Sequence, residues 1–126
     1  MLNTELIRSE INEASQQWIK AFNMTDIKTC VETYMTNAVM DARPMGRYEG
    51  REAIYKFWDG FVSSTNAGDL SYSEVDVQII NENTAKLSAK WSMNVGRGFI
   101  SEELWVKEGQ RWFLSYDDFT VEEQFN

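Results

Sequence analysis

The spacing of apolar residues changes once along this 126-residue chain, near residue 66, and that change restricts the fold more than any other feature. Before it, apolar side chains recur every three or four residues, which is the period of an amphipathic helix. After it, they alternate with polar ones, which is the period of a half-buried strand. Helices followed by a run of strands predict an α+β fold, with the helices packed on one face of an antiparallel sheet.

Three segments carry the helical period, and we expect helices over residues 4–23, 25–35 and 51–63. In the third, Ile54, Phe57, Trp58 and Phe61 lie three or four positions apart, as on one buried face. Between the second and third helices we expect a short strand over residues 38–42 and a turn over residues 43–46.

Four strands are expected in the second half, over residues 70–80, 84–95, 99–107 and 111–121. The first alternates at Val75, Val77 and Ile79. The second has the clearest alternation, with one face made of Ala85, Leu87, Ala89, Trp91, Met93 and Val95.

The last two strands are apolar on both faces. We assign to the outer face Ile100, Leu104, Val106, Trp112, Leu114 and Tyr116. The inner face then holds Phe99, Glu103, Trp105, Phe113, Ser115, Asp117 and Phe119. A sheet that is apolar on both sides is usually covered on both. Helices cover one side, so we expect a homodimer in which a second copy covers the outer side.

Composition narrows the function classes. The net charge of −8 disfavours nucleic acid and anionic membrane surfaces as partners. The N-terminal residues are charged and no window approaches ~20 apolar residues, so we expect neither a signal peptide nor a membrane span. We therefore expect one cytoplasmic domain over residues 1–126. The single cysteine, Cys30, has apolar neighbours at helical spacing, which predicts a buried side chain without chemistry.

The chain has no histidine. Serine–histidine and cysteine–histidine catalysis, imidazole acid–base chemistry and the common zinc sites are therefore excluded. Any proton transfer must use Asp, Glu, Tyr or Lys side chains. We expect neither a metal nor a cofactor.

Several short motifs occur in an order that resembles the nuclear-transport-factor-2-like superfamily, in particular its SnoaL-like and ketosteroid-isomerase-like branch. In chain order they are Trp18, residues 23–26, Tyr34, residues 38–41, residues 50–58, residues 104–109, Trp112, Asp117 and Phe119. The resemblance implies a cone, in which three helices lie across a strongly curved antiparallel sheet. It also implies an apolar pocket between the helices and the sheet.

By that resemblance the pocket would be lined by Trp18, Phe22, Tyr34, Met40, Phe57, Phe61, Ala89, Trp91, Met93, Trp105 and Phe119. A small apolar ligand is the partner that such a pocket implies. The alternative is that these side chains fill the space themselves.

The catalytic residues of ketosteroid isomerases are not all present. In those enzymes a carboxylate on the short strand moves a proton, while a helix-one tyrosine and a later-strand aspartic acid stabilise the oxyanion. The corresponding positions here hold Ala42, Trp18 and Glu103. Asp41 lies one residue from the short-strand position, so it points into the pocket only if the strand is offset or bulged.

Asp117 and Glu103 are therefore the main catalytic candidates, and Asp41 is a weaker one. Each of the first two lies two residues from an aromatic side chain that we assign inward, Phe119 or Trp105. Two carboxylates in an apolar pocket push their proton affinities apart, so one can act as acid and the other as base.

Simpler alternatives exist for all three carboxylates. Glu103 and Asp117 are also compatible with exposed strand positions beside Arg97 or Arg111. Asp41 is compatible with a surface ion pair to Arg43 or Arg47, which would be worth little.

Two functions follow. The first is a cofactor-free isomerase or cyclase of the SnoaL-like kind, which would act on a small apolar carbonyl compound by carboxylate chemistry. The second is a non-catalytic module of the same fold that binds a ligand or associates with a partner.

Overall fold

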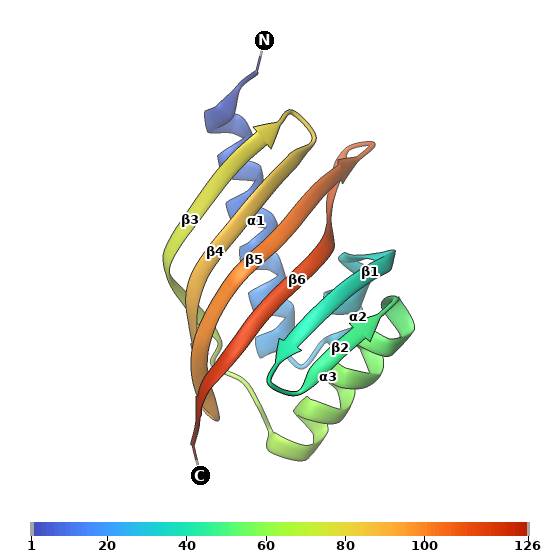
Figure 1. Cartoon of the computed structure of the whole chain (residues 1–126), viewed down its shortest axis with the longest axis vertical. Helices are drawn as coiled ribbons and strands as arrows, with labels where there is room; N and C mark the ends of the chain where they lie inside the picture. The colour runs from blue at the N-terminus through green and yellow to red at the C-terminus, as the bar shows by residue number, and fades with distance from the viewer. Residues whose placement is uncertain (1, 126) are drawn as a thin grey trace.

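The computed structural model describes residues 2–125 and confirms the α+β fold (Figure 1). In chain order its elements are α1 (Thr4–Asn23), α2 (Ile27–Glu32), β1 (Tyr34–Arg43), β2 (Gly46–Glu49), α3 (Arg51–Thr65), β3 (Ser71–Asn81), β4 (Thr84–Met93), β5 (Gly96–Glu108) and β6 (Arg111–Gln124). The strands form one sheet in the order β2-β1-β6-β5-β4-β3. Only β1 and β6 pair in parallel; the other neighbours are antiparallel.

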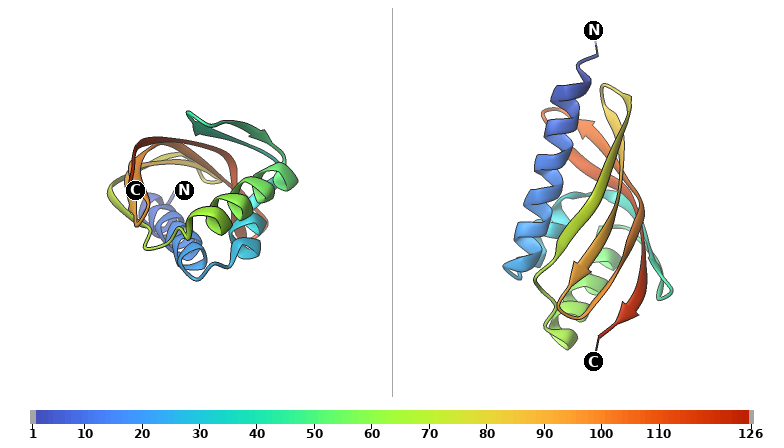
Figure 2. Two further views of the ribbon diagram at one scale, coloured as in Figure 1. Left: turned by 90° about the horizontal axis from the view of Figure 1, so that it is seen from below. Right: turned by 90° about the vertical axis from the view of Figure 1, so that its left-hand side faces the viewer.

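The sheet curves strongly, and the three helices lie across its concave side (Figure 2). The long helix α1 contacts β3 and β6, while α3 contacts β1 and β2. The apolar stripes that the sequence predicts for these helices face the sheet: Ile11, Phe22 and Ile54 are fully enclosed, and Phe57 and Phe61 are half-buried. The space between the helices and the sheet is therefore walled by apolar side chains from both layers.

The second helix is shorter than its sequence pattern predicts. α2 ends at Glu32, and Tyr34 already belongs to β1, where it is paired with Leu114 of β6. The backbone N–H of Leu114 donates to the carbonyl oxygen of Thr33 over 2.8 Å. Pairing with β6 thus overrides the helical pattern and extends β1 to 10 residues.

β2 begins within the segment that we expected to be a turn. Gly46 is opposite Ala42 and Glu49 is opposite Val39 in an antiparallel pair. This four-residue strand is one edge of the sheet. Because it is so short and carries no apolar alternation, the sequence pattern did not predict it.

A β-bulge interrupts β5. Ile100 is opposite Phe119, whereas Glu102 is opposite Asp118, so Ser101 is an extra residue on β5. A bulge of this kind reverses the alternation of side chains and bends the strand. Ile100, which we expected on the outer face, therefore points inward and is buried.

A second bulge interrupts β6. Leu104 is opposite Tyr116 and Trp105 is opposite Leu114, so Ser115 is the extra residue. Our assignment of Trp112 and Leu114 to the outer face was therefore wrong. Both are buried on the helical side of the sheet, where the indole N–H of Trp112 donates to Glu10 of α1 over 2.8 Å.

A further irregularity changes the first strand of the second half. Ser73 of β3 is opposite Lys90 and Asp76 is opposite Ser88, with Glu74 in a left-handed conformation at φ 51°. Val75, which simple alternation places on the same face as Val77, is consequently 42 % exposed, whereas Val77 is buried. Tyr72, on the other side of the irregularity, turns towards the interior.

Candidate functional site

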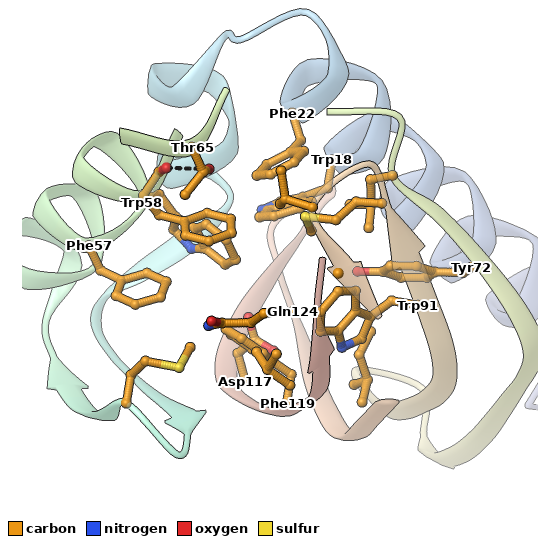
Figure 3. A pocket seen from close by; sticks show the side chains of 18 of the residues that line it. Trp18, Phe22, Phe57, Trp58, Thr65, Tyr72, Trp91, Asp117, Phe119 and Gln124 are labelled. Atoms are coloured by element: carbon orange, nitrogen blue, oxygen red, sulfur yellow. Dashed lines mark hydrogen bonds between the residues drawn. The ribbon is translucent and has the colours of Figure 1, made fainter. Parts of the chain in front are cut away.

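A cavity of about 450 Å³ lies between the concave face of the sheet and helices α1 and α3 (Figure 3). Its size is within the range of small-molecule sites, about 300–1,000 Å³. The helical side of its wall comprises Trp18, Phe22, Phe57, Trp58, Phe61 and Thr65. The sheet and its connections contribute Tyr72, Trp91, Met93, Ile100, Glu103, Leu114, Asp117, Phe119, Val121 and Gln124, among others.

The aromatic side chains of the wall are packed against one another. The rings of Trp18 and Phe22 stack with centroids 5.4 Å apart, and Trp58 meets both at steep angles. Trp58 also stacks on Phe119 across the cavity, at 5.5 Å. Such contacts hold the rings in fixed orientations, so the cavity has a defined shape.

Glu103 and Asp117 lie side by side in this apolar wall. They are directly opposite each other on the antiparallel strands β5 and β6, and they are 4 % and 5 % exposed. The bulge at Ser101 lies two residues before Glu103, and the bulge at Ser115 lies two residues before Asp117. Together the two bulges set which face of the sheet carries the two carboxyl groups.

In the described part of the chain, the donors that contact these two carboxyl groups are uncharged. Oε1 of Glu103 accepts from the indole N–H of Trp105 over 3.0 Å, and Oε2 accepts from the hydroxyl of Tyr72 over 3.0 Å. Oδ2 of Asp117 accepts from the hydroxyl of Tyr34 over 2.7 Å. No hydrogen bond found among residues 2–125 reaches Oδ1 of Asp117.

Burial raises the pKa of both carboxyl groups. For Glu103, desolvation is the largest cause, followed by the charge of Asp117, and the hydrogen bonds from Trp105 and Tyr72 oppose both. For Asp117, desolvation again comes first, and the hydrogen bond from Tyr34 opposes it. Within the described residues no lysine or arginine lines the cavity, so no cation restores the ordinary pKa.

Asp41 lies outside the cavity that holds Glu103 and Asp117. Its carboxylate accepts a bidentate pair of hydrogen bonds from Arg47, at 2.9 and 3.0 Å, and another from the hydroxyl of Tyr116. Hydrogen bonds from Arg47 and Tyr116 lower the pKa of Asp41 to about 2. Asp41 is absent from the wall of the cavity and takes part in the ion pair that its sequence neighbours Arg43 and Arg47 suggested.

The structure brings together seven of the eleven residues that the resemblance placed around a pocket: Trp18, Phe22, Phe57, Phe61, Trp91, Met93 and Phe119. The other four, Tyr34, Met40, Ala89 and Trp105, are buried in the core but do not form the wall. Tyr34 and Trp105 lie one hydrogen bond behind the two carboxyl groups. They support the site without lining it.

Four wall residues with polar side chains were missed at the sequence level: Trp58, Thr65, Tyr72 and Gln124. Trp58 was expected on a buried helical face but not at the cavity, and its indole N–H donates to the Tyr34 hydroxyl over 3.3 Å. Tyr72 precedes the irregularity in β3, so simple alternation did not assign it to the same face as Val77. Its aromatic character next to a polar turn was the available signal.

Residues 2–125 contain neither a cluster of metal ligands nor a membrane-spanning helix. No group of three or more His, Cys, Asp or Glu side chains is arranged to hold a metal ion. No helix in this part of the chain is both long and apolar enough to span a bilayer.

The chain belongs to the SnoaL-like domain family, since a model of that family matches residues 15–119. No curated protein matches the chain. Solved structures share its fold at low sequence identity. One is a protein of unknown function with a cystatin-like fold from Nostoc punctiforme PCC 73102, with 16% identity, coverage of 97% of this chain and 96% of that chain, and a TM-score of 0.84.

Two further structures are similar over most of their length. A ketosteroid isomerase-like protein from Erwinia carotovora atroseptica has 17% identity, coverage of 91% of this chain and 95% of that chain, and a TM-score of 0.77. Aln2 from a Streptomyces species has 11% identity, coverage of 96% of this chain and 94% of that chain, and a TM-score of 0.85. At these identities the likeness establishes the cone-shaped fold alone.

Proposed function

We propose that this protein is a cofactor-free isomerase or cyclase that acts on a small, uncharged, largely apolar carbonyl compound. One observation carries the proposal: Glu103 and Asp117 are opposite each other in the wall of an apolar cavity, and the donors that contact them within residues 2–125 are neutral. When two carboxyl groups are buried together without a cation, their pKa values are raised towards neutral pH, where acid–base catalysis requires them.

The chemistry follows from the protonation of the pair. Two neighbouring buried carboxyl groups resist double ionisation, so near neutral pH one keeps its proton and the other loses it. The ionised group takes a proton from the carbon beside the substrate carbonyl, and the electron pair of that C–H bond forms an enolate. The protonated group donates a hydrogen bond to the enolate oxygen. Return of the proton to another carbon completes an isomerisation.

Asp117 is the better placed of the two to meet a substrate. Both oxygens of Glu103 already accept hydrogen bonds from protein groups. Asp117 has Tyr34 at Oδ2 only, and it lines the cavity. We therefore assign proton abstraction to Asp117, with Tyr34 as the positioning residue that holds its carboxyl group.

Deuterium exchange tests this assignment without knowledge of the natural substrate. The probes are simple aryl ketones such as 4-ethylacetophenone, whose acetyl protons are followed by NMR in D₂O. Wild-type protein should accelerate their exchange, and Asp117→Asn should lower the rate by ~10²–10⁴, the usual effect of losing a general base. Glu103→Gln should also lower it, because the partner acid is lost.

Asp41→Asn is the matched control, since it removes a carboxylate outside the cavity. It should leave the exchange rate unchanged. Full exchange activity in both Asp117→Asn and Glu103→Gln, with loss in Asp41→Asn, would refute the assignment and favour a short-strand base.

A non-catalytic ligand-binding module is the second candidate function. The saturation of both Glu103 oxygens by Trp105 and Tyr72 favours it, because a carboxylate used only for structure would be bonded in this way. Ketone binding compared with ketone proton exchange distinguishes the two functions. A module would bind the aryl ketones and show no exchange above the buffer rate.

We also propose a homodimer through the outer face of the sheet. The bulges change the composition of the expected face: Ile100, Trp112 and Leu114 leave it, whereas Leu104, Val106 and Tyr116 remain. Phe99 and Phe113, which we had assigned to the inner face, join it, and all five of these side chains are partly exposed. A row of partly exposed apolar side chains on neighbouring strands supports a covered face.

A further inference from the structure

A further bulge interrupts β6 near its end. Val121 is opposite Gly98 and Glu123 is opposite Arg97, so Glu122 is an extra residue on β6. Beyond this bulge, Oε1 of Glu123 accepts a hydrogen bond from Nε of Arg97 over 2.9 Å, in an exposed ion pair. A bulge of this kind redirects the side chains that follow it.

This bulge brings a carboxamide, and not a carboxylate, into the cavity. Phe119 and Val121 both line the cavity, and plain alternation from them would point Glu123 inward and Gln124 outward. With the extra residue, Gln124 lines the cavity and Glu123 does not. The place of Gln124 in the wall is therefore set by the backbone of β6.

Gln124 lies at the mouth of the cavity, whereas the carboxyl pair lies deep within it. Gln124 is exposed, while the two carboxyl residues are 4 % and 5 % exposed. The end of the strand is held in place, since the backbone N–H of Phe125 donates to the carbonyl oxygen of Val95 over 2.9 Å. Figure 3 shows the Gln124 side chain reaching from this strand end into the cavity.

The carboxamide of Gln124 is available to a ligand. Within residues 2–125, both hydroxyl groups of the cavity wall are engaged: Thr65 donates to the carbonyl oxygen of Phe61 over 2.7 Å, and Tyr72 donates to Glu103 over 3.0 Å. No hydrogen bond within the same residues uses the Gln124 side chain. Its two N–H donors and its acceptor oxygen are therefore without a protein partner.

The charges around the mouth decide which chemical group fits the carboxamide. Glu122 and Glu123 precede Gln124 in the chain, the carboxyl pair lies deeper, and no lysine or arginine among the described residues lines the cavity. An anionic group would therefore be repelled. A cation would use the carboxamide oxygen alone, because the two N–H groups cannot accept. A hydroxyl group donates to the oxygen and accepts from an N–H, so it matches both halves of the carboxamide.

We infer that Gln124 binds an uncharged hydroxyl group of the ligand at the mouth of the cavity. The ligand is then a keto alcohol with an apolar body, its carbonyl group directed at Asp117 and its hydroxyl group at the opposite end. This rests on the proposed function in taking the cavity as the site of a carbonyl ligand. It goes further by naming a specificity-determining residue and the end of the ligand that enters first.

A matched pair of ketones tests the inference by calorimetry. 4-Acetyl-4′-(hydroxymethyl)biphenyl and 4-acetyl-4′-ethylbiphenyl differ only in a hydroxyl or a methyl group at the end remote from the carbonyl. The ratio of their affinities isolates this group, because the contributions of the acetyl end and the biphenyl body cancel. The anion 4′-acetylbiphenyl-4-carboxylate should bind more weakly than the ethyl compound; tighter binding of the anion would overturn the assignment to a neutral group.

Two methionine variants show which residue sets the ratio. Gln124→Met keeps an unbranched side chain but removes the amide, so it should lower the ratio of alcohol to ethyl affinity about threefold to tenfold, the worth of a neutral hydrogen bond. Gln78→Met is the control, since Gln78 is an exposed residue of β3 outside the cavity wall, and its ratio should equal that of the wild type. In ¹⁵N-labelled protein, the side-chain amide signals that disappear in Gln124→Met should shift more with the alcohol than with the ethyl compound.

The outcomes separate this inference from the proposed function. An equal affinity ratio in wild-type protein and Gln124→Met, together with ketone proton exchange by the wild type, would overturn the inference alone. A lowered ratio in Gln124→Met without any ketone proton exchange would support the inference and overturn catalysis. Failure of the wild type to bind either biphenyl ketone, or an equal fall of the ratio in Gln78→Met, would also overturn the inference.

Discussion

The hydroxyl group of Tyr34 donates to Oδ2 of Asp117 over 2.7 Å, across 83 positions of the chain. Tyr34 begins β1, and Asp117 lies in the middle of β6, the strand that pairs with β1 in parallel. Behind it, the indole N–H of Trp58 donates to the same hydroxyl. The orientation of the Asp117 carboxyl group is thus tied to β1 and to α3 at once.

Tyr34→Phe should shift the pH dependence of ketone exchange. The Tyr34 hydrogen bond lowers the pKa of Asp117 against the effect of burial, so its loss raises that pKa further. The rising limb of the exchange rate should move to higher pH, and the protein should lose about 1–3 kcal/mol of stability because the Trp58 N–H loses its acceptor. NMR exchange rates and urea unfolding measure the two effects.

Tyr55→Phe provides the control for that experiment. Tyr55 lies on α3 with 42 % of its surface exposed, and it is not part of the cavity wall. Tyr55→Phe should leave the rising limb of the exchange rate at the same pH as in the wild type. An unshifted limb in Tyr34→Phe would contradict the positioning role.

Stability should fall as the pH rises from about 4.5 into the alkaline range. Glu103 and Asp117 have pKa values raised above their ordinary values of 4.5 and 3.8, so between those values and the raised ones the folded state holds protons that the unfolded state has released. The cost is about 1.4 kcal/mol for each tenfold change in a dissociation constant. Urea unfolding at pH 5 and pH 8.5 measures it.

Glu103→Gln should flatten this dependence, because the amide does not titrate. A free energy of unfolding that rises between pH 5 and pH 8.5 in the wild type would contradict the raised pKa values.

At acid pH, the change in the free energy of unfolding should depend on Asp41. Its pKa is lowered to about 2, so the stability that it contributes is present above the ordinary value of 3.8 and is lost as the pH falls through 2. Asp41→Asn should therefore weaken the acid-side loss of stability without altering the alkaline side. The same urea series, extended to pH 2.5, gives the comparison; identical acid-side slopes in variant and wild type would count against it.

Gly98→Ala should destabilise the protein and disturb Trp91. A Cβ at this position would collide with the carbonyl oxygen of Thr120 and lie 2.8 Å from Cζ2 of the Trp91 ring. Such overpacking typically costs about 1–3 kcal/mol. Thermal unfolding and tryptophan emission report the two effects.

Gly60→Ala is the opposite case. Gly60 lies within α3, and a Cβ there meets nothing within 4 Å. The variant should gain about 0.5–1 kcal/mol, because alanine loses less backbone freedom than glycine in a helix. Equal behaviour of the two alanine variants would show that β5 can move away from Trp91.

Leu104→Lys should weaken self-association. Leu104 is partly exposed on the outer face of the sheet, next to Tyr116 on β6. Sedimentation of the wild type at micromolar concentration should give twice the 14.7 kDa chain mass, and the variant should move towards the single-chain mass. Leu6→Lys, at a 54 % exposed position of α1, should change nothing. A monomeric wild type would exclude the dimer.

The fold could be predicted from the sequence because one change of period separates helices from strands. The alternation in β4 is regular, so Ala85, Leu87 and Trp91 were correctly assigned to the buried face. Both carboxyl candidates of the cavity were found in the same way, from their spacing to Trp105 and Phe119. These inferences needed only local periodicity.

The positions that were assigned wrongly or missed depend on strand pairing between residues far apart in the sequence. The two bulges beside the carboxyl pair fall at Ser101 and Ser115, which carry no local signal for an irregular strand. Trp112 and Leu114 were therefore assigned to the wrong face, and Tyr72 was missed as a partner of Glu103. Strand register across β5 and β6 decides these positions, and that register involves residues far apart in sequence.

The two bulges also decide what a one-residue deletion would do to the carboxyl pair. Because Ser101 and Ser115 each add one residue, inward neighbours are three positions apart, as in Ile100–Glu103 and Leu114–Asp117. Loss of one serine would restore plain alternation and turn a carboxyl group out of the cavity while the hydrogen-bonded ladder remained. Deletion of a single strand residue would thus remove a carboxyl group from the cavity wall although the carboxylate itself stays in the sequence.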